Sequence, residues 1–118
     1  MRDEPLVTAA FAAWLGTEGW TVAPYPADPY LDLYAERGPD RLLVEVKGRT
    51  TEPGLDVDTG YGQLLRRMVP DIAARYALVV PDTPAAVRAA LRVPGPVRDL
   101  LRITLFAVTA DGAVRPLR

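Results

Sequence analysis

The chain has 118 residues, of which 49% are hydrophobic and 25% are charged, and its formal net charge at pH 7 is −1. These values predict one soluble globular domain over residues 1–118. The absence of cysteine and histidine excludes disulfides, thiolate metal sites and every histidine-based catalytic arrangement, so any catalysis must use carboxylates and lysine. The nearly balanced charge neither supports nor excludes a nucleic-acid partner.

No apolar run approaches the roughly 20 residues that a membrane-spanning helix needs. The N-terminal residues also lack the basic start and apolar core of a signal peptide. We therefore expect a cytoplasmic protein with no membrane partner.

The first half of the chain predicts a helix, a short strand and a β-hairpin. The helix follows Pro5 and carries apolar residues at helical spacing up to Leu15, and the strand covers Trp20–Ala23. Two further strands, Tyr30–Glu36 and Arg41–Lys47, flank a segment of strong turn residues, Arg-Gly-Pro-Asp. These two strands should pair in an antiparallel hairpin.

The second half alternates helices and strands. A polar loop over residues 48–58 leads to a helix from about Gly60 to Val69 and then to a buried strand, Tyr76–Val80. The strand, helix, strand order predicts a βαβ crossover. The later elements are a helix opened by Thr83-Pro84 and ended by Pro94-Gly95-Pro96, and strands at 103–108 and 113–117 around an Asp-Gly turn. The expected fold is α/β, a mixed sheet covered by helices on both faces.

The predicted hairpin brings charged residues together. If Glu36 faces Arg41 across the turn, Asp32 lies opposite Glu45 and Tyr30 lies opposite Lys47. Asp32, Glu45 and Lys47 then share one face of the hairpin. Two carboxylates directly across a strand pair repel each other, and a divalent cation with oxygen ligands, such as Mg²⁺ or Mn²⁺ in its place, would compensate.

Lys47 is the only lysine among the fourteen basic residues, and the rest are arginine. Its compact ammonium could position or help deprotonate an attacking water, or neutralise charge on a phosphate in the transition state. The alternative is a solvated face on which Lys47 is an ordinary ion-pair partner of the two acids.

The pattern of Asp32, twelve intervening residues and then Glu45-Val46-Lys47 resembles the PD-(D/E)XK nuclease superfamily, which has the restriction-endonuclease-like fold. The chain departs from the family name because Leu31, not proline, precedes Asp32. Asp28 is a competing first carboxylate, which we rank second because it would break the cross-strand pairing.

The resemblance implies further site residues. An acidic residue on the first helix, which corresponds to Glu4 or alternatively to Asp3, would join the metal site, and the Val46 carbonyl would be a third ligand. Gln63 resembles the glutamine on the helix after the triad, which helps to place water or substrate. It could equally be a surface amide.

Three arginines could bind phosphate. Arg66 and Arg67 lie near the face of Gln63, and alternation along the strand places Arg49 at the mouth of the same site. Helical arginines on a protein surface are more often only solvated.

These features predict a Mg²⁺-dependent DNA endonuclease-like protein that hydrolyses phosphodiester bonds, with Asp32, Glu45, Lys47 and Gln63 in its active site. The resemblance also makes a homodimer plausible. Two alternatives remain open: a catalytically inactive nuclease-fold module that binds nucleic acid or a protein partner, and a structural domain with a coincidental triad.

Overall fold

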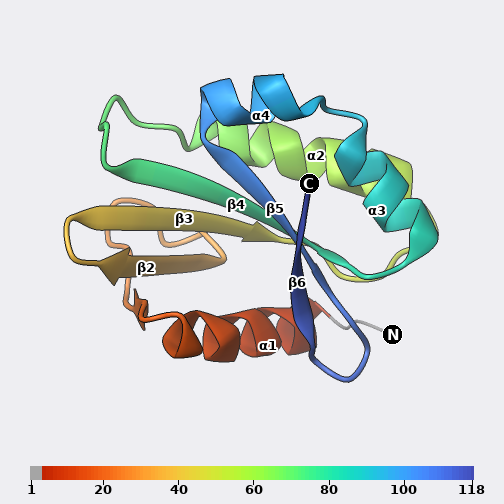
Figure 1. Ribbon diagram of the computed structural model, residues 1–118, viewed down its shortest axis with the longest axis horizontal. Coiled ribbons are helices and arrows are strands. Elements are labelled where there is room, and N and C mark those ends of the chain that lie inside the picture. Colours follow the sequence, from red (N-terminus) through yellow and green to blue (C-terminus); the bar gives the residue numbers. More distant parts are fainter. Residues whose placement is uncertain (1–3) are drawn as a thin grey trace.

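The computed structural model describes residues 4–118 and contains a six-stranded mixed sheet between two helical layers (Figure 1). The strands lie in the order β1-β2-β3-β4-β5-β6. Their bounds are β1 Thr21–Val22, β2 Leu33–Arg37, β3 Asp40–Val46, β4 Ala74–Pro81, β5 Ile103–Val108 and β6 Val114–Leu117. The helices are α1 Glu4–Thr17, α2 Pro53–Arg66, α3 Pro84–Leu91 and α4 Gly95–Leu101. The α/β class and the mixed sheet are confirmed.

The hairpin of β2 and β3 has the predicted register. Glu36 pairs with Arg41, and Leu33 pairs with Val44. The turn closes over Gly38 and Pro39, and Gly38 adopts a φ of 58°, which favours glycine. β2 begins three residues later than predicted because the Asp28 side chain and carbonyl accept hydrogen bonds from the Tyr30 and Leu31 amides and fold this segment into a turn.

The later start of β2 changes the position of Tyr30. The ladder ends at Leu33 and Val44, so the predicted pairing of Tyr30 with Lys47 does not form. Tyr30 is instead 83% exposed, at the edge of the loop over residues 23–32. This segment holds three prolines, which do not extend a regular ladder.

The βαβ crossover is confirmed, because β3 pairs with β4 in parallel and α2 connects them. β5 continues the parallel part, and β6 returns antiparallel. The helix α2 begins at Pro53, inside the predicted polar loop, and ends at Arg66. Its buried residues Val57, Gly60, Tyr61 and Leu64 follow helical spacing over this range. α4 was not predicted: Pro94-Gly95-Pro96 ends α3 but also starts a new helix.

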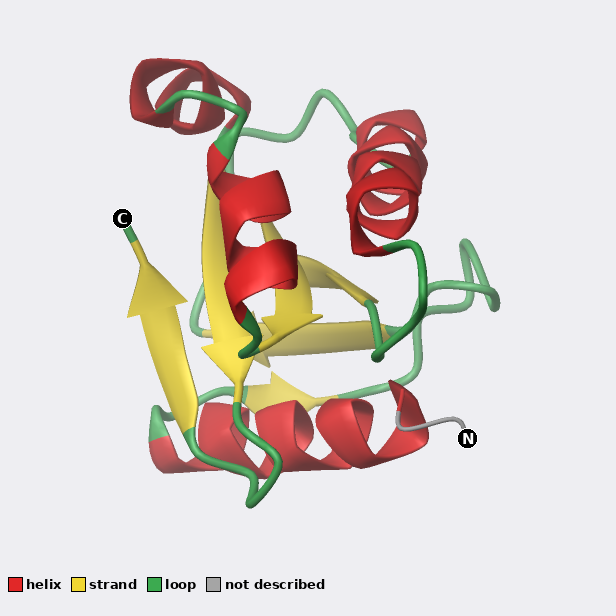
Figure 2. Cartoon of the chain, turned by 90° about the vertical axis from the view of Figure 1, so that its right-hand side faces the viewer, coloured by secondary structure: helices red, strands yellow, loops and turns green. Residues whose placement is uncertain are grey.

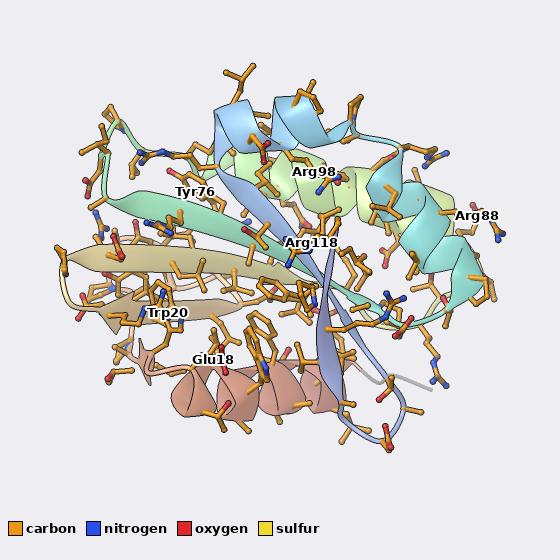
Figure 3. The ribbon with its side chains drawn as sticks, viewed as in Figure 1. Glu18, Trp20, Tyr76, Arg88, Arg98 and Arg118 are labelled. Carbon is orange, nitrogen blue, oxygen red and sulfur yellow. The ribbon has the colours of Figure 1, made fainter. Side chains whose placement is uncertain are left out.

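The sheet separates two apolar cores, as Figure 2 shows with α1 below the strands and the other helices above them. On the α1 side, Phe11 and Leu15 pack against Val44 and Val46. Trp20 lies between the end of α1 and β2 (Figure 3), where the Arg37 guanidinium covers its ring at 4.3 Å. None of the described helices is long and apolar enough to cross a bilayer.

Alternation along β3 determines the face of the sheet on which each of its polar side chains lies. Leu42, Val44 and Val46 belong to the core on the α1 side, whereas Leu43 belongs to the core under α2. Glu45 therefore faces α2, and the parallel strands β3 and β4 lie side by side beneath that helix (Figure 1).

Candidate functional site

Asp32 and Glu45 form a carboxylate pair at the start of β2. Asp32 immediately precedes β2, just beyond the last ladder pair, and its carboxyl group is hydrogen-bonded to that of Glu45. Asp32 Oδ2 accepts a hydrogen bond of 2.7 Å from the Val46 amide, which fixes the orientation of its carboxyl group. Glu45 is 4% exposed, a degree of burial that charged residues rarely reach without a partner.

This burial has an electrostatic consequence. Burial is the largest of several effects that together raise the pKa of Glu45 to about 8: the hydrogen bond and charge of Asp32 also raise it, whereas the charges of Arg67 and Lys47 lower it. Glu45 therefore binds its proton far more tightly than an exposed glutamate. An additional cation beside the pair would favour the ionised form of both acids.

Lys47 lies directly beyond β3 and is 9% exposed. Its amide donates to the Val79 carbonyl at 2.8 Å, which keeps this residue against β4. Its side chain passes under α2 at Gly60, where a Cβ atom would lie 3.1 Å from Lys47 Cε and 3.0 Å from Leu78 Cδ1. Glycine at this position thus makes room for the lysine between helix and sheet.

The Lys47 ammonium group has no ion pair with a carboxylate among residues 4–118. It lies close enough to Glu45 for its charge to lower the pKa of that acid. The alternative in which Lys47 is an ordinary salt-bridge partner lacks support from this geometry. A buried ammonium beside two acids is an arrangement that can serve chemistry.

Arg67, the C-cap residue of α2, enters the carboxylate site. Its guanidinium donates to Glu45 Oε1 at 2.9 Å and to Asp28 Oδ2 at 2.8 Å, and its side chain is 16% exposed. From the sequence, Arg67 is a candidate phosphate ligand and Asp28 is a rival first carboxylate. The structure joins both to Glu45 through one guanidinium, a contact that no spacing in the sequence indicates.

Gln63 lies on α2 between Gly60 and Arg67, three residues after the first and four before the second. Its carbonyl lies 3.4 Å from the Arg67 guanidinium. Its side-chain oxygen Oε1 is buried and has no hydrogen-bond partner among the described residues. A buried acceptor without a donor is uncommon in native proteins and often marks a place for water or an ion.

Glu4 and Arg49, which the sequence also predicts as site residues, do not join the carboxylate pair. Glu4 is the first residue of α1, and Asp3 lies outside the described residues. Over residues 4–118, no group of three or more acidic, histidine or cysteine side chains could hold a metal ion, so Glu4 is not gathered with Asp32 and Glu45. Arg49 is exposed and lines a separate pocket of about 250 Å³ beside α1, because the alternation of β3 ends at Val46.

A hollow of about 390 Å³ opens next to the carboxylate pair. Asp28 and Asp32 both line it, and its other walls come from the loop over residues 23–32 and the start of β2. Arg66 is exposed at the end of α2, one residue before Arg67. Asp28 and Asp32 therefore border open space, whereas Glu45 and Lys47 do not line it.

The donor set fits Mg²⁺ in part. Two carboxylates and a main-chain carbonyl are oxygen ligands of the kind that Mg²⁺ takes while it keeps several waters, and the unpartnered Gln63 oxygen could accept from one of them. Asp32, Glu45 and the Val46 carbonyl would hold the ion. The Arg67 contact to Glu45 opposes binding, because it already supplies a positive charge to one of these ligands.

No family model matches the chain, and no curated protein sequence matches it either. Two solved structures are similar over nearly the whole length. An XisH family protein from Nostoc punctiforme PCC 73102 has a TM-score of 0.65 at 19% identity, covering 96% of this chain and 99% of that one. An fdxN element excision controlling factor protein from Anabaena variabilis has a TM-score of 0.58 at 18% identity, covering 97% and 99%.

At these identities the similarity establishes the fold and nothing finer. This chain has a mixed six-stranded sheet between helices, an α/β fold that is consistent with the restriction-endonuclease-like fold expected from the sequence.

Proposed function

We propose that this chain is a metal-dependent nuclease that hydrolyses phosphodiester bonds, with DNA as its substrate. The observation that carries the proposal is the convergence of Asp32, Glu45 and Lys47 on the α2 face of the sheet, with the last two buried. A purely structural role would not require a buried glutamate and a buried lysine beside a second acid, since burying charge costs several kcal/mol per ion.

Each residue has a distinct role in this proposal. Asp32, held by the Val46 amide, and Glu45 bind Mg²⁺ or Mn²⁺ together with the Val46 carbonyl. When bound, the metal ion supplies Lewis acidity toward the phosphoryl group and stabilises the charge that develops there. Lys47 orients the attacking water or neutralises a non-bridging phosphate oxygen, and Gln63 accepts a hydrogen bond from water through its unpartnered Oε1.

The choice of DNA rests on indirect support. One structural neighbour is described as an excision controlling factor, and excision of a genetic element is compatible with a DNA substrate. Arg66 is exposed beside the site and could contact the phosphate backbone. Arg49, in the pocket beside α1, could extend such a contact to a second phosphate.

A second candidate is a module with the same fold that binds DNA or a protein without cutting. The ion pair of Arg67 with Glu45 favours it, because a permanently held guanidinium would neutralise a metal ligand. Within residues 4–118, no third acidic side chain joins the pair in a group that could hold a metal ion, which points the same way. The two functions differ in whether a phosphodiester bond is broken.

The test is cleavage of supercoiled plasmid and four-way-junction DNA in Mg²⁺ or Mn²⁺. Wild type should nick or cut at least one substrate, and Glu45→Gln should not. The matched control is Glu18→Gln, at an exposed glutamate near the end of α1 (Figure 3), which should cleave like wild type. DNA binding without cleavage by wild type would favour the noncatalytic module.

A further inference from the structure

The Arg67 guanidinium has two carboxylate partners, Glu45 and Asp28. Its guanidinium is shared between Glu45 on β3 and Asp28 in the loop over residues 23–32, and it also lies 3.4 Å from the Tyr30 and Gln63 carbonyls. Three parts of the fold thus meet on one side chain. A planar guanidinium suits this task because it donates in several fixed directions at once.

The contact to Glu45 is incompatible with full metal ligation of the same oxygen. The Glu45 side chain is only 5% exposed, so little room is left for a further ligand beside the Arg67 contact. A divalent ion bound there would also stand next to a positive guanidinium, which repels it strongly in a site of low dielectric. Metal binding at Glu45 is therefore stronger once Arg67 has moved away from it.

A phosphate can take the place of Glu45 as the partner of Arg67. Guanidinium forms bidentate pairs with phosphate as readily as with carboxylate. Arg67 holds Asp28, which lines the hollow together with Asp32, and the Arg67 side chain keeps 16% of its surface exposed, through which a phosphate can approach it.

We propose that Arg67 couples nucleic-acid binding to metal binding at Glu45. In the free protein, Arg67 neutralises Glu45 and weakens its hold on the metal ion; a backbone phosphate of the nucleic acid draws the guanidinium away and leaves Glu45 to the metal. This inference rests on the proposed function, since it takes Glu45 as a metal ligand. Coupling of this kind is reciprocal, so bound metal should strengthen DNA binding by the same factor.

The experiment measures Mn²⁺ affinity from the loss of the free-ion signal in electron paramagnetic resonance. The full-length variants are wild type, Arg67→Met, Arg67→Lys and Arg88→Met. Arg88 is an exposed arginine on α3 (Figure 3), remote in sequence from the site elements, and it controls for the loss of one charge. Glu45→Gln measures Mn²⁺ that binds elsewhere. Circular dichroism checks that each variant is folded.

We expect Arg67→Met to bind Mn²⁺ roughly 10- to 100-fold more tightly than wild type, the range that corresponds to one hydrogen bond to a charged group. Arg67→Lys should fall between them, because one ammonium cannot bridge Glu45 and Asp28 in the same way. Arg88→Met should equal wild type. Equal affinities for wild type and both Arg67 variants would overturn the inference.

The second half of the experiment adds a saturating 20-base-pair DNA duplex, with the Glu45→Gln complex as the background. DNA should raise the Mn²⁺ affinity of wild type by a factor similar to that of Arg67→Met, and it should add little in Arg67→Met itself. An equal effect of DNA on both proteins, or none on wild type, would refute the coupling. If wild type and Glu45→Gln bind Mn²⁺ equally, the metal site fails, and with it the proposed function.

Discussion

Gly60 and Gly62 provide a matched pair of substitutions that tests how Lys47 is accommodated under α2. Both glycines lie inside the helix, where alanine is favoured over glycine by about 0.5–1 kcal/mol. A Cβ atom at Gly62 would meet nothing within 4 Å. Gly62→Ala should therefore raise the free energy of unfolding by about 0.5–1 kcal/mol.

The same methyl group at Gly60 would crowd the site. It would lie 3.0 Å from Leu78 Cδ1, which is fully buried, and 3.1 Å from Lys47 Cε. Overpacking of this kind costs about 1–3 kcal/mol, which exceeds the gain in helix propensity. Gly60→Ala should therefore be less stable than Gly62→Ala by about 1–3 kcal/mol.

Urea unfolding of the two variants and wild type, followed by circular dichroism, measures this difference directly. The slope of the transition should be unchanged, so the midpoints alone should report it. If Gly60→Ala is stabilised as much as Gly62→Ala, the close approach of α2 to Lys47 is not a constraint, and our account of how the lysine is positioned is wrong.

Three further predictions concern the acids and the core. Burial is the main reason that the pKa of Glu45 rises from its ordinary 4.5 to about 8, so the folded metal-free protein binds this proton more tightly than the unfolded chain. The free energy of unfolding should therefore fall as the pH rises from about 4.5 to 8. Urea titrations at several pH values measure this slope, and Glu45→Gln should largely remove it. Above about pH 8, where Glu45 is ionised, Asp32→Asn should raise the metal-free melting temperature, because it removes like-charge repulsion while keeping an acceptor for the Val46 amide, and it should abolish the rise caused by Mn²⁺; an unchanged metal response would exclude the pair as a metal site. The buried Tyr61 hydroxyl donates to the Ala90 carbonyl, and burial raises the pKa of this hydroxyl to about 12. Because Tyr61→Phe leaves that carbonyl without its donor, it should lower the free energy of unfolding by about 1–3 kcal/mol. An unchanged free energy of unfolding would contradict this contact.

The hairpin shows what local patterns in the sequence can predict. Its register follows from Gly38 and Pro39 at the turn and from strict alternation of apolar residues in β3, and both features act between neighbours in the chain. The strand Ile103–Val108 also has its predicted bounds. The same alternation predicts that Glu45 lies on one face of β3 and that Val44 and Val46 lie on the opposite, apolar face.

The errors arise where a local pattern has two meanings. Val57 has only the exposed Leu55 as an apolar neighbour in the first turns of α2, so these turns resemble a loop until Leu78 and the sheet are present to bury Val57. Pro94-Gly95-Pro96 ends one helix, but proline is also favoured in a first turn, and α4 begins there.

The Arg67 network could not have been predicted from spacing. It joins Glu45, Asp28 and the end of α2, which are separated by 17 to 39 residues and meet only after the βαβ unit has formed. The loop that carries Asp28 has no periodic pattern that would fix its position. Long-range contacts of this kind depend on the packing of whole elements.

The most direct test of the proposed function is the single-turnover rate of DNA cleavage by wild type and by Lys47→Arg, at saturating Mn²⁺ and DNA. The substitution keeps the positive charge but replaces the compact ammonium beside Gly60 with a larger planar group that retains its proton near neutral pH. We predict that Mn²⁺ binding is kept and that the rate falls about 10²- to 10⁴-fold, the usual contribution of an acid-base group. Equal rates would reduce Lys47 to an electrostatic partner of Asp32 and Glu45, and no cleavage by wild type would contradict the proposed function itself.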